Sequence, residues 1–391
     1  MTMHTALPHA NPVDVGLCPE RTQRLMDVLR REVASGRLPG AVAMIARRGK
    51  IGLFEAVGQQ DPSTGAPMKT DSIFRIYSMT KPVVSVAVMM LVERGQLLLN
   101  DPVSRWLPEY AKQQVATAQG LQPVRQEATV QDLLRHTAGL TYEFLGDSPV
   151  QRQYREVKID SRERSNATFS QTLAALPLQF QPGSMWAYSR ATDVLGRLVE
   201  VVSGQGLGAF LQAEIFGPLG MVDTGFAVPP EQHHRIAEPF AHDPDGGVPM
   251  KVLEPRQVPA MEGGGGGLMS TAMDYTRFLH CLRNRGALDG VRLLGPHTVD
   301  YMTADHLGGT PSDGTLLPPG HGFGLGFAVR THLGLSPVPG SVGLYYWGGI
   351  AGTTFFVDPA LDMHAMLMVQ APNQRDYYRP LFRDLVYAAL L

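Results

Sequence analysis

A serine and a lysine stand three residues apart directly before a long apolar run, and this arrangement limits the possible folds more than any other feature of the chain. The two residues are Ser78 and Lys81, and the apolar run covers 82–91, ahead of Gly95. Such a run predicts a buried helix that ends at a glycine. Because residues three apart share one face of a helix, the hydroxyl and the amine come together at its start. A lysine in an apolar site loses its proton readily and can activate a serine as a nucleophile.

The proline at position 82 indicates where this helix starts. Proline is tolerated only in the first helical turn, so we expect either that the helix begins near Thr80 or that its first turn is irregular, with Ser78 at its N-terminus. Free backbone N–H groups and the positive end of the helix dipole suit an oxyanion at that point. In the alternative, structural interpretation, Ser78 caps the helix and Lys81 is exposed. A chance Ser-Xaa-Xaa-Lys match is expected in roughly a third of chains with so few lysines.

Two further motifs follow in a fixed order. Residues 186–190 have the sequence Trp-Ala-Tyr-Ser-Arg, and residues 346–350 have the sequence Tyr-Trp-Gly-Gly-Ile. Serine β-lactamases and penicillin-binding proteins carry three such elements in this order. The chain resembles the family VIII carboxylesterases, which share the class C β-lactamase fold, and it is also similar to related acyltransferases and D-amino-acid peptidases. Weaker matches at 133–140, 218–221 and 265–272 extend the resemblance over nearly the whole chain.

The resemblance implies a role for each catalytic residue. Ser78 is expected to be the acyl-enzyme nucleophile, Lys81 to take or relay its proton, and Tyr188 to complete the site. The backbone N–H groups of Ser78 and Ile350 are expected to form the oxyanion hole. A phenol has a pKa of about 10, so Tyr188 needs nearby positive charge to act as a phenolate base. Which of Lys81 and Tyr188 holds the proton at rest is a coupled titration that the sequence leaves open.

Substrate contacts are expected from aromatic residues and from the glycine pair. Gly348 and Gly349 would let a substrate approach the backbone closely, and Trp347 offers a large apolar surface. The stretch 342–347 favours a β-strand, which we expect at the edge of the sheet beside the nucleophile. Aromatic walls of the site are predicted from Trp186 and Tyr142, with Phe144 and Tyr345 as further candidates.

Two departures from the β-lactamase pattern concern the substrate. Where those enzymes have Lys-Thr-Gly, with a cation for the substrate carboxylate, this chain has Trp347 and two glycines. We therefore expect weak selection for an anionic β-lactam. Where they have Tyr-Xaa-Asn, whose amide grips an acylamino side chain, this chain has Arg190 in place of the asparagine. The Arg190 guanidinium either polarises Tyr188 or points to solvent, and we expect it to point to solvent, as isolated arginines usually do.

The predicted fold class is α/β (α+β), a serine β-lactamase-like fold with an antiparallel sheet flanked by helices plus a helix-rich lobe. Residues 1–391 are expected to form a single catalytic domain. Its α/β lobe is expected from about 1–96 and 262–391, and its helix-rich lobe from about 97–261. Hydrophobic patterning predicts helices over 19–35 and 378–390. The strands that the same patterning predicts are 40–46, 51–57, 324–331, 342–347, 353–357 and 364–369.

Motifs of other chemistries have little support. A Gly-Xaa-Ser-Xaa-Gly nucleophile elbow does not occur in the sequence, which argues against an α/β-hydrolase. His-Glu-Xaa-Xaa-His is also missing, and we expect no metal and no cofactor. The glycine run 263–267 lacks the Gly-Lys-Ser/Thr ending of a phosphate loop, and it is interpreted as a flexible connection into the following helix. His136 is interpreted as a structural hydrogen-bonding residue.

Charge and composition bear on partners and location. The formal net charge is −2 and no basic block occurs, so nucleic acid is not an expected partner. Residues 1–14 lack an apolar core, so neither a signal peptide nor a membrane anchor is predicted, and a cytoplasmic location is expected. The two cysteines, Cys18 and Cys281, are too few for a disulfide framework. The oligomeric state is not predicted.

The leading hypothesis is a serine carboxylesterase. Ser78 attacks a small-molecule ester with a short or medium acyl group, an alcohol leaves, and water resolves the acyl-enzyme. Ser78, Tyr188 and Trp347 are expected to meet in a cleft between the two lobes. Three alternatives stay open: an acyltransferase that uses the same acyl-enzyme, a β-lactamase or D-aminopeptidase, and a non-catalytic ligand-binding module of the same fold.

Overall fold

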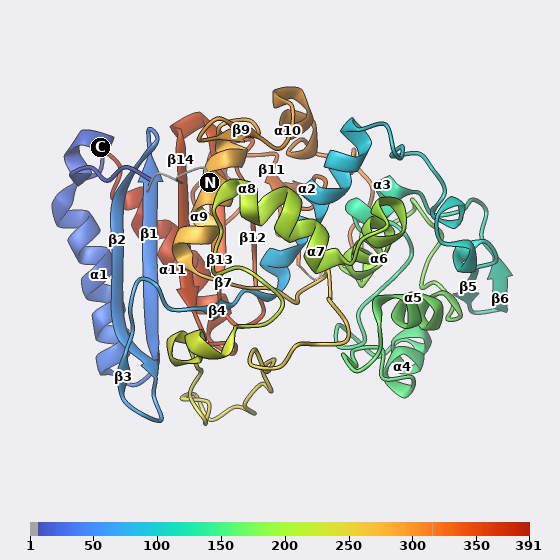
Figure 1. Ribbon diagram of the computed structural model, residues 1–391, viewed down its shortest axis with the longest axis horizontal. Coiled ribbons are helices and arrows are strands. Elements are labelled where there is room, and N and C mark those ends of the chain that lie inside the picture. Colours follow the sequence, from blue (N-terminus) through green and yellow to red (C-terminus); the bar gives the residue numbers. More distant parts are fainter. Residues whose placement is uncertain (1–6, 315) are drawn as a thin grey trace.

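A large antiparallel sheet is built from both ends of the chain (Figure 1). The computed structural model describes residues 7–314 and 316–391. Strands that follow the N-terminus lie beside strands that precede the C-terminus, with Ala41 opposite Val369. In spatial order the eight strands are β10 (His321–Phe323), β11 (Ala328–Arg330), β12 (Tyr345–Gly348), β13 (Thr354–Asp358), β14 (Met363–Val369), β1 (Gly40–Arg47), β2 (Lys50–Asp61) and β3 (Ala66–Pro67).

Side chains that alternate along the central strands give the sheet two apolar faces. In β1, Met44 belongs to the larger core and Ile45 to a smaller one. Helices α1 (Pro19–Ala34) and α11 (Arg375–Ala388) pack on the smaller core. Helix α9 (Ala272–Arg283) covers the opposite face of the sheet (Figure 1). Both faces are therefore closed, and a ligand site must lie beyond an end or a side of the sheet.

The central helix of the larger core is α2 (Thr80–Glu93), in which every residue from Thr80 to Leu91 is buried. It begins at Thr80, after a 3-10 turn over Tyr77–Met79, so both the start and the irregular turn that Pro82 allowed are present. Helix α6 (Ala191–Ser203) packs against it. This contact ties the serine–lysine motif to the motif that precedes α6.

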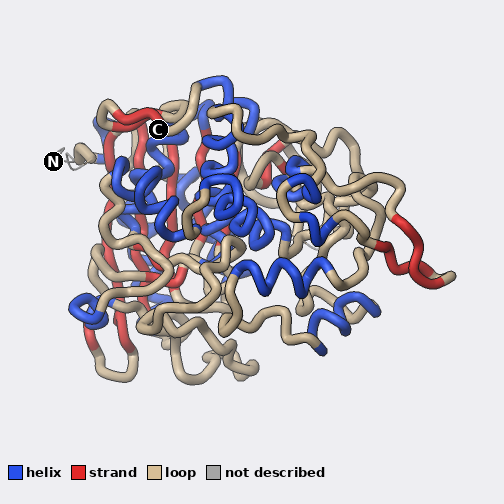
Figure 2. The backbone as a smooth tube through the Cα atoms, turned by 45° about the vertical axis from the view of Figure 1, so that its right-hand side comes forward, coloured by secondary structure: helices blue, strands red, loops and turns tan. Residues whose placement is uncertain are grey.

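The other helices and strands are short, and most of them lie in the middle of the chain. The remaining α-helices are α3 (Val130–Leu134), α4 (Pro149–Glu156), α5 (Asn166–Ala174), α7 (Leu207–Leu211), α8 (Gly217–Leu219) and α10 (Pro296–Met302). Three two-stranded pairs are β4 (Phe74–Arg75) with β7 (Met269–Ser270), β5 (Gln114–Thr117) with β6 (Gly120–Pro123), and β8 (Ala287–Leu288) with β9 (Val291–Arg292). The β5–β6 hairpin stands away from the rest of the molecule (Figure 2).

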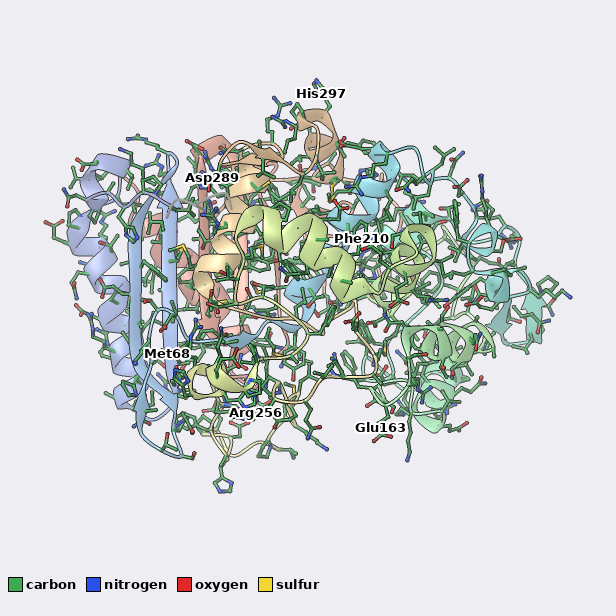
Figure 3. All side chains as sticks on the ribbon, viewed as in Figure 1. Met68, Glu163, Phe210, Arg256, Asp289 and His297 are labelled. Carbon is green, nitrogen blue, oxygen red and sulfur yellow. The ribbon has the colours of Figure 1, made fainter. Side chains whose placement is uncertain are left out.

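Burial of side chains separates the core from the surface. Phe210 in α7 lies in the interior, whereas His297 in α10 projects into solvent (Figure 3). Within the described residues no single helix has the length and apolar composition needed to cross a membrane. Helix α6 and the segment Leu207–Leu219 have that length and composition only when they are taken together, and they are bent by 77° relative to each other. The division of the domain into lobes near residues 97 and 261 stays a prediction.

Two strand predictions need correction. The stretch 324–331 is not one strand, because Gly326 has a φ of 100° and the Gly324 N–H bonds to Phe327 in a turn between β10 and β11. This turn brings β11 alongside β12, so β12 is not the edge strand that the sequence predicted. Its pairing with β11 stops at Tyr346, while Trp347 pairs with β13 on the other side. The open side of β12 is thus confined to its C-terminal end.

Candidate active site

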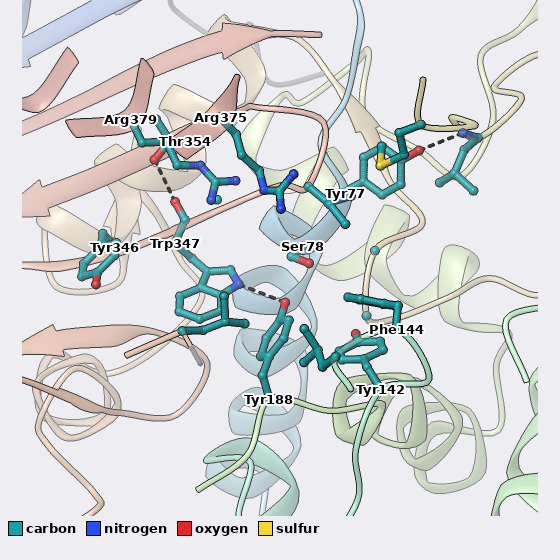
Figure 4. Close-up of a pocket in the computed structure, with 18 of the residues that line it drawn as sticks. Tyr77, Ser78, Tyr142, Phe144, Tyr188, Tyr346, Trp347, Thr354, Arg375 and Arg379 are labelled. Carbon is teal, nitrogen blue, oxygen red and sulfur yellow. Dashed lines mark hydrogen bonds between the residues drawn. The ribbon is translucent and has the colours of Figure 1, made fainter. Parts of the chain in front are cut away.

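A cavity of about 500 Å³ lies between the C-terminal end of β12, helix α11 and the turn before α2 (Figure 4). Its lining includes Ser78, Tyr142, Tyr188 and Trp347, which come from distant parts of the chain. Aromatic rings form much of the wall, with the Tyr188 ring centroid 5.1 Å from Trp347 and 5.2 Å from Tyr142. The motifs that were far apart in the sequence therefore meet at one cavity.

Ser78 is half-buried at the N-terminal end of α2. The residue before it, Tyr77, has a φ of 43°, in the left-handed region that residues other than glycine rarely adopt. The Tyr77 hydroxyl accepts the backbone N–H of Leu253 at 2.8 Å, which anchors this conformation. Backbone strain of this kind costs roughly 1–3 kcal/mol and is concentrated at functional sites.

Lys81 lies beneath Ser78 and is only 1% exposed. Its Nζ donates to Ser78 Oγ at 3.3 Å, to the Tyr142 hydroxyl at 2.9 Å and to the Gly265 carbonyl at 2.6 Å. Burial lowers the pKa of the Lys81 amine to about 7. An amine with such a pKa can exchange a proton with a neighbouring hydroxyl at neutral pH. The alternative interpretation of Lys81 as an exposed first-turn residue is wrong.

Tyr188 stands across the cavity from the serine, just before α6. Its hydroxyl accepts the indole N–H of Trp347 at 3.1 Å (Figure 4), and Lys81 Nζ lies 4.5 Å from its ring centroid. Burial raises the pKa of the Tyr188 phenol above its ordinary value, although hydrogen bonds with Ser78 and Trp347 offset part of the effect. At neutral pH the phenol therefore keeps its proton more firmly than the Lys81 amine does.

The glycine pair after Trp347 serves two different contacts. Gly348 lines the cavity, and an added Cβ there would lie 2.9 Å from a terminal nitrogen of Arg379. Gly349 does not line the cavity, because it packs on the nucleophile turn, where an added Cβ would lie 2.4 Å from the Ile76 carbonyl oxygen. Its predicted substrate contact is therefore wrong. Ile350, the predicted oxyanion-hole residue, lines the cavity.

Two of the predicted aromatic walls are turned away from the cavity. Trp186 is 0% exposed and its ring stacks behind Tyr188, with 6.5 Å between centroids, so it supports the site without reaching a substrate. Tyr345 is on the same face of β12 as Trp347, but its ring is buried against Phe327, with 5.1 Å between centroids, and it is likewise not part of the lining. His136 bonds to Ser189 Oγ at 3.0 Å, as its structural interpretation predicted. Of the predicted walls, Tyr142 and Phe144 do line the cavity.

The glycine run 263–267 is not the flexible connection that the sequence suggested. Its backbone packs against the start of α6, where an added Cβ on Gly264 would lie 2.5 Å from the Thr192 carbonyl oxygen. The Gly265 carbonyl accepts a hydrogen bond from Lys81 Nζ, and the Gly265 N–H donates to Asp193 Oδ1 at 2.7 Å. These contacts make the run a wall of the site. The contact between Gly265 and Lys81 was not predicted from the sequence, because every residue has a backbone carbonyl and residue type does not show which carbonyl accepts a hydrogen bond.

Arg190 does not point to solvent as expected. Its Nε donates to Glu143 Oε2 at 3.2 Å, and its terminal nitrogen lies 3.5 Å from Asp193 Oδ2. The guanidinium carbon is 4.8 Å from the ring centroid of Tyr142. Burial opposes the charge of Arg190, but Glu143 and Asp193 together raise its pKa above the ordinary value. The arginine is thus a fixed positive charge inside the site.

Helix α11 brings further positive charge that the sequence analysis did not assign to the site. Arg375 and Arg379 line the cavity and lie on the same side of Ser78 (Figure 4). Arg379 donates to the Gly349 carbonyl oxygen. Burial, followed by the charge of Arg375, lowers the pKa of Arg379 to about 10, so it remains protonated at neutral pH. Replacement of a lysine by Trp347 therefore does not leave the cavity without cations.

Metal-binding residues do not gather in the part of the chain that the structure describes. Over 7–314 and 316–391, no group of three or more His, Cys, Asp or Glu side chains is arranged to hold a metal ion. The absence of a cofactor stays a prediction.

A half-buried serine beside a buried lysine, above a large antiparallel sheet flanked by helices, defines a β-lactamase-like serine hydrolase fold. The Beta-lactamase family model matches residues 25–388, and the chain belongs to this family. Esterase EstB from Burkholderia gladioli is 36% identical over 419 aligned positions, which cover 99% of this chain and 100% of EstB. Similarity over the full length, on a serine hydrolase fold, supports an esterase.

Solved structures extend this similarity to acyl transfer. EstCE1, described as a hydrolase with promiscuous acyltransferase activity, has a TM-score of 0.79 and 28% identity, and the match covers 94% of this chain and 98% of EstCE1. Unliganded simvastatin synthase (LovD) from Aspergillus terreus also has a TM-score of 0.79, with 27% identity over 94% of this chain and 98% of LovD. The fold is thus shared with serine hydrolases and acyltransferases.

Proposed function

We propose that the chain is a serine carboxylesterase, similar to family VIII, that hydrolyses esters with short to medium acyl groups through an acyl-enzyme on Ser78. The observation that carries the proposal is the buried Lys81 amine, 3.3 Å from Ser78 Oγ and with a pKa of about 7. A nucleophile beside a base of this kind, at a cavity, is the arrangement that acyl transfer requires. Similarity to Esterase EstB supports the same class of reaction.

In the proposed acylation step, neutral Lys81 takes the Ser78 proton while the hydroxyl oxygen attacks the ester carbonyl. The backbone N–H groups of Ser78 and Ile350 are assigned to the oxyanion of the tetrahedral intermediate. Collapse of this intermediate breaks the bond to the alcohol oxygen. Tyr188, whose phenol stays protonated at neutral pH, is assigned as the proton donor to the leaving alcohol, and Lys81 then returns a proton to Tyr188. Water repeats the sequence to release the acid.

The proposed substrate is a small-molecule ester. A cavity of about 500 Å³ is within the range that small ligands occupy. Trp347, Tyr142 and Phe144 supply apolar contacts to the acyl or alcohol group. The ester linkage itself is expected to lie at Ser78, where the lysine and the tyrosine converge.

The test compares hydrolysis of p-nitrophenyl acetate and butyrate by the wild type and by Ser78→Ala. We expect the variant to fall to near background, because loss of the nucleophile removes the acyl-enzyme and costs several powers of ten in rate. Ser85→Ala is the matched control, since Ser85 is buried in the same helix but does not line the cavity. Hydrolysis that persists in a folded Ser78→Ala protein would refute the proposal.

Acyl transfer to an alcohol is a second candidate function. The observation that favours it is the shared fold with EstCE1 and with LovD. Both reactions use the same acyl-enzyme and differ in the acceptor that resolves it. Product analysis with p-nitrophenyl butyrate and a rising concentration of a primary alcohol separates them, because a transferase forms mostly the new ester, whereas an esterase forms mostly butyrate.

A cytoplasmic location is also part of the proposal. Cys18 and Cys281 are both free thiols, which suits a reducing compartment. Fractionation of cells that express the full chain tests this, and recovery of the protein outside the cytosolic fraction would contradict it.

A further inference from the structure

A buried carboxylate stands behind the catalytic lysine of the proposed mechanism. Asp193, 3% exposed, is the third residue of α6. Its Oδ1 accepts the backbone N–H of Gly265 at 2.7 Å, and the carbonyl of that glycine accepts from Lys81 Nζ at 2.6 Å. A single glycine residue thus joins the carboxylate to the amine.

The contact between Asp193 and Gly265 is so close that a side chain at position 265 would displace the carboxylate. An added Cβ on Gly265 would lie 2.7 Å from Asp193 Oδ2. On its outer side, the run is held by Arg162, which donates to the Gly266 carbonyl at 3.3 Å. Because the glycine backbone is confined on both sides, a change at Asp193 is transmitted to the Gly265 carbonyl.

The second oxygen of Asp193 faces an opposing charge. A terminal nitrogen of Arg190 lies 3.5 Å from it, and Arg190 is held from the other side by Glu143. The Arg190 guanidinium also packs over the ring of Tyr142, whose hydroxyl accepts from Lys81. A negative and a positive group therefore flank the lysine site from the start of α6.

We propose that Asp193 is a positioning residue for Lys81, which holds the Gly265 carbonyl in place for the amine and, opposed by Arg190, sets the charge around that amine. This inference rests on the function proposed above. Asp193 thereby acts on the catalytic lysine, although the residue lies outside the three motifs at 78–81, 186–190 and 346–350.

The sign of each charge effect follows from the geometry. Burial is the largest influence on the Lys81 pKa and lowers it, while Asp193 raises it and Arg190 lowers it further. His136 stays neutral, since burial holds its pKa well below the ordinary value. The titratable and charged groups that face the amine from the elements packed around it are Ser78, His136, Tyr142, Tyr188, Arg190 and Asp193. Behind them, Glu143 pairs with Arg190, and Arg162 donates to the Gly266 carbonyl.

The experiment measures the rate at which a fluorophosphonate labels Ser78, by intact-protein mass spectrometry, from pH 5 to pH 10. Asp193→Asn keeps an oxygen that can accept the Gly265 N–H but removes the charge, so the acid limb of the profile should move to lower pH by about 1 unit. Arg190→Gln removes the opposing charge, so the same limb should move to higher pH. Asp193→Ala removes the acceptor as well, and labelling should slow about tenfold or more at every pH because the amine is misplaced.

Asp274→Asn is the matched control. Asp274 is 4% exposed, is the third residue of α9, and accepts the backbone N–H of Asp223 at 2.7 Å, but it does not line the cavity. Its variant should show the wild-type pH profile. Circular dichroism and thermal unfolding of each variant establish whether it is folded. If the Asp193 variants do not fold, the pH profile of Arg190→Gln provides the test.

The outcomes separate this inference from the proposed function. Acid limbs that stay in place, or that move in the same direction in Asp193→Asn and Arg190→Gln, would overturn the role of Asp193 while wild-type labelling and ester hydrolysis leave the esterase intact. Labelling of Asp193→Ala at the wild-type rate would overturn it as well. A wild type that is neither labelled at Ser78 nor active on esters would remove the proposed function, and this inference with it.

Discussion

The indole N–H of Trp347 donates to the hydroxyl of Tyr188 across 3.1 Å (Figure 4). The residue that stands where β-lactamases have a lysine is thus joined directly to the tyrosine of the site. Trp347→Phe keeps an aromatic wall and removes the donor. We expect kcat/KM for p-nitrophenyl butyrate to fall about tenfold, which corresponds to the loss of a hydrogen bond worth about 1.4 kcal/mol.

The control for this variant is Trp106→Phe. Trp106 also donates its indole N–H, to Asp101 at 3.4 Å, but it does not line the cavity. Its variant should keep the wild-type kcat/KM. If Trp347→Phe is as active as the wild type, the tryptophan acts only as an apolar wall and its hydrogen bond has no part in the reaction.

Activity should depend on pH through Lys81. Burial lowers the pKa of its amine to about 7, and the amine accepts the Ser78 proton only in its neutral form. Because the amine is protonated below that pKa, kcat/KM is expected to fall as the pH drops through about 7 and to level off above it. Steady-state hydrolysis of p-nitrophenyl butyrate between pH 5 and pH 9 measures this. An acid limb near pH 4 would point to a carboxylate base instead.

The parts of the site that the sequence predicted are those whose signal resides in side-chain type. Ser78 and Lys81 were found from their spacing and from the apolar helix that follows, and Pro82 located the start of that helix. Tyr188 and Trp347 were found because their motifs occur in a known order. Each of these residues lines the cavity or contacts one that does.

The parts that the sequence missed depend on tertiary contacts. Gly265 acts through its backbone carbonyl, which any residue possesses, so neither the glycine run nor the weak match at 265–272 indicated its contact with Lys81. Arg190 looked like a solvent-exposed charge because its partner Glu143 is 47 residues away in the chain. Arg379 enters the site from the C-terminal helix, and no local pattern connects it to Ser78. Charge pairing and helix packing decide these positions, and neither is local in sequence.

Gly349 should be intolerant of a side chain for a steric reason. An added Cβ would lie 2.4 Å from the Ile76 carbonyl oxygen, and a backbone atom in the nucleophile turn cannot give way as a flexible side chain does. We expect Gly349→Ala to destabilise the protein by roughly 1–3 kcal/mol, as overpacking usually does. Chemical denaturation measures the loss. Gly225→Ala is the control, because the nearest atom to its added Cβ is 3.6 Å away, and an equal loss in both variants would contradict the steric explanation.

Arg379 should influence which esters the cavity accepts. Its Nε is buried without a hydrogen-bond partner among the described residues, and Arg375 beside it adds a second positive charge. Two cations in a partly desolvated cavity attract an anionic group on the substrate. The sequence predicted weak selection for an anionic β-lactam because Trp347 replaces a lysine, but with Arg375 and Arg379 in the lining we expect an anionic group on an ester substrate to be favoured.

Two esters of equal chain length test this effect of Arg379. We expect the wild type to prefer mono-p-nitrophenyl adipate to p-nitrophenyl hexanoate, and Arg379→Gln to lower the ratio of the two kcat/KM values about tenfold, the effect of losing one charge contact worth about 1.4 kcal/mol. Arg24→Gln, at an exposed position on α1, should leave the ratio unchanged. Because both esters release the same nitrophenol, a ratio that is equal in the wild type and in Arg379→Gln would mean that the arginine supports Gly349 without selecting the acyl group.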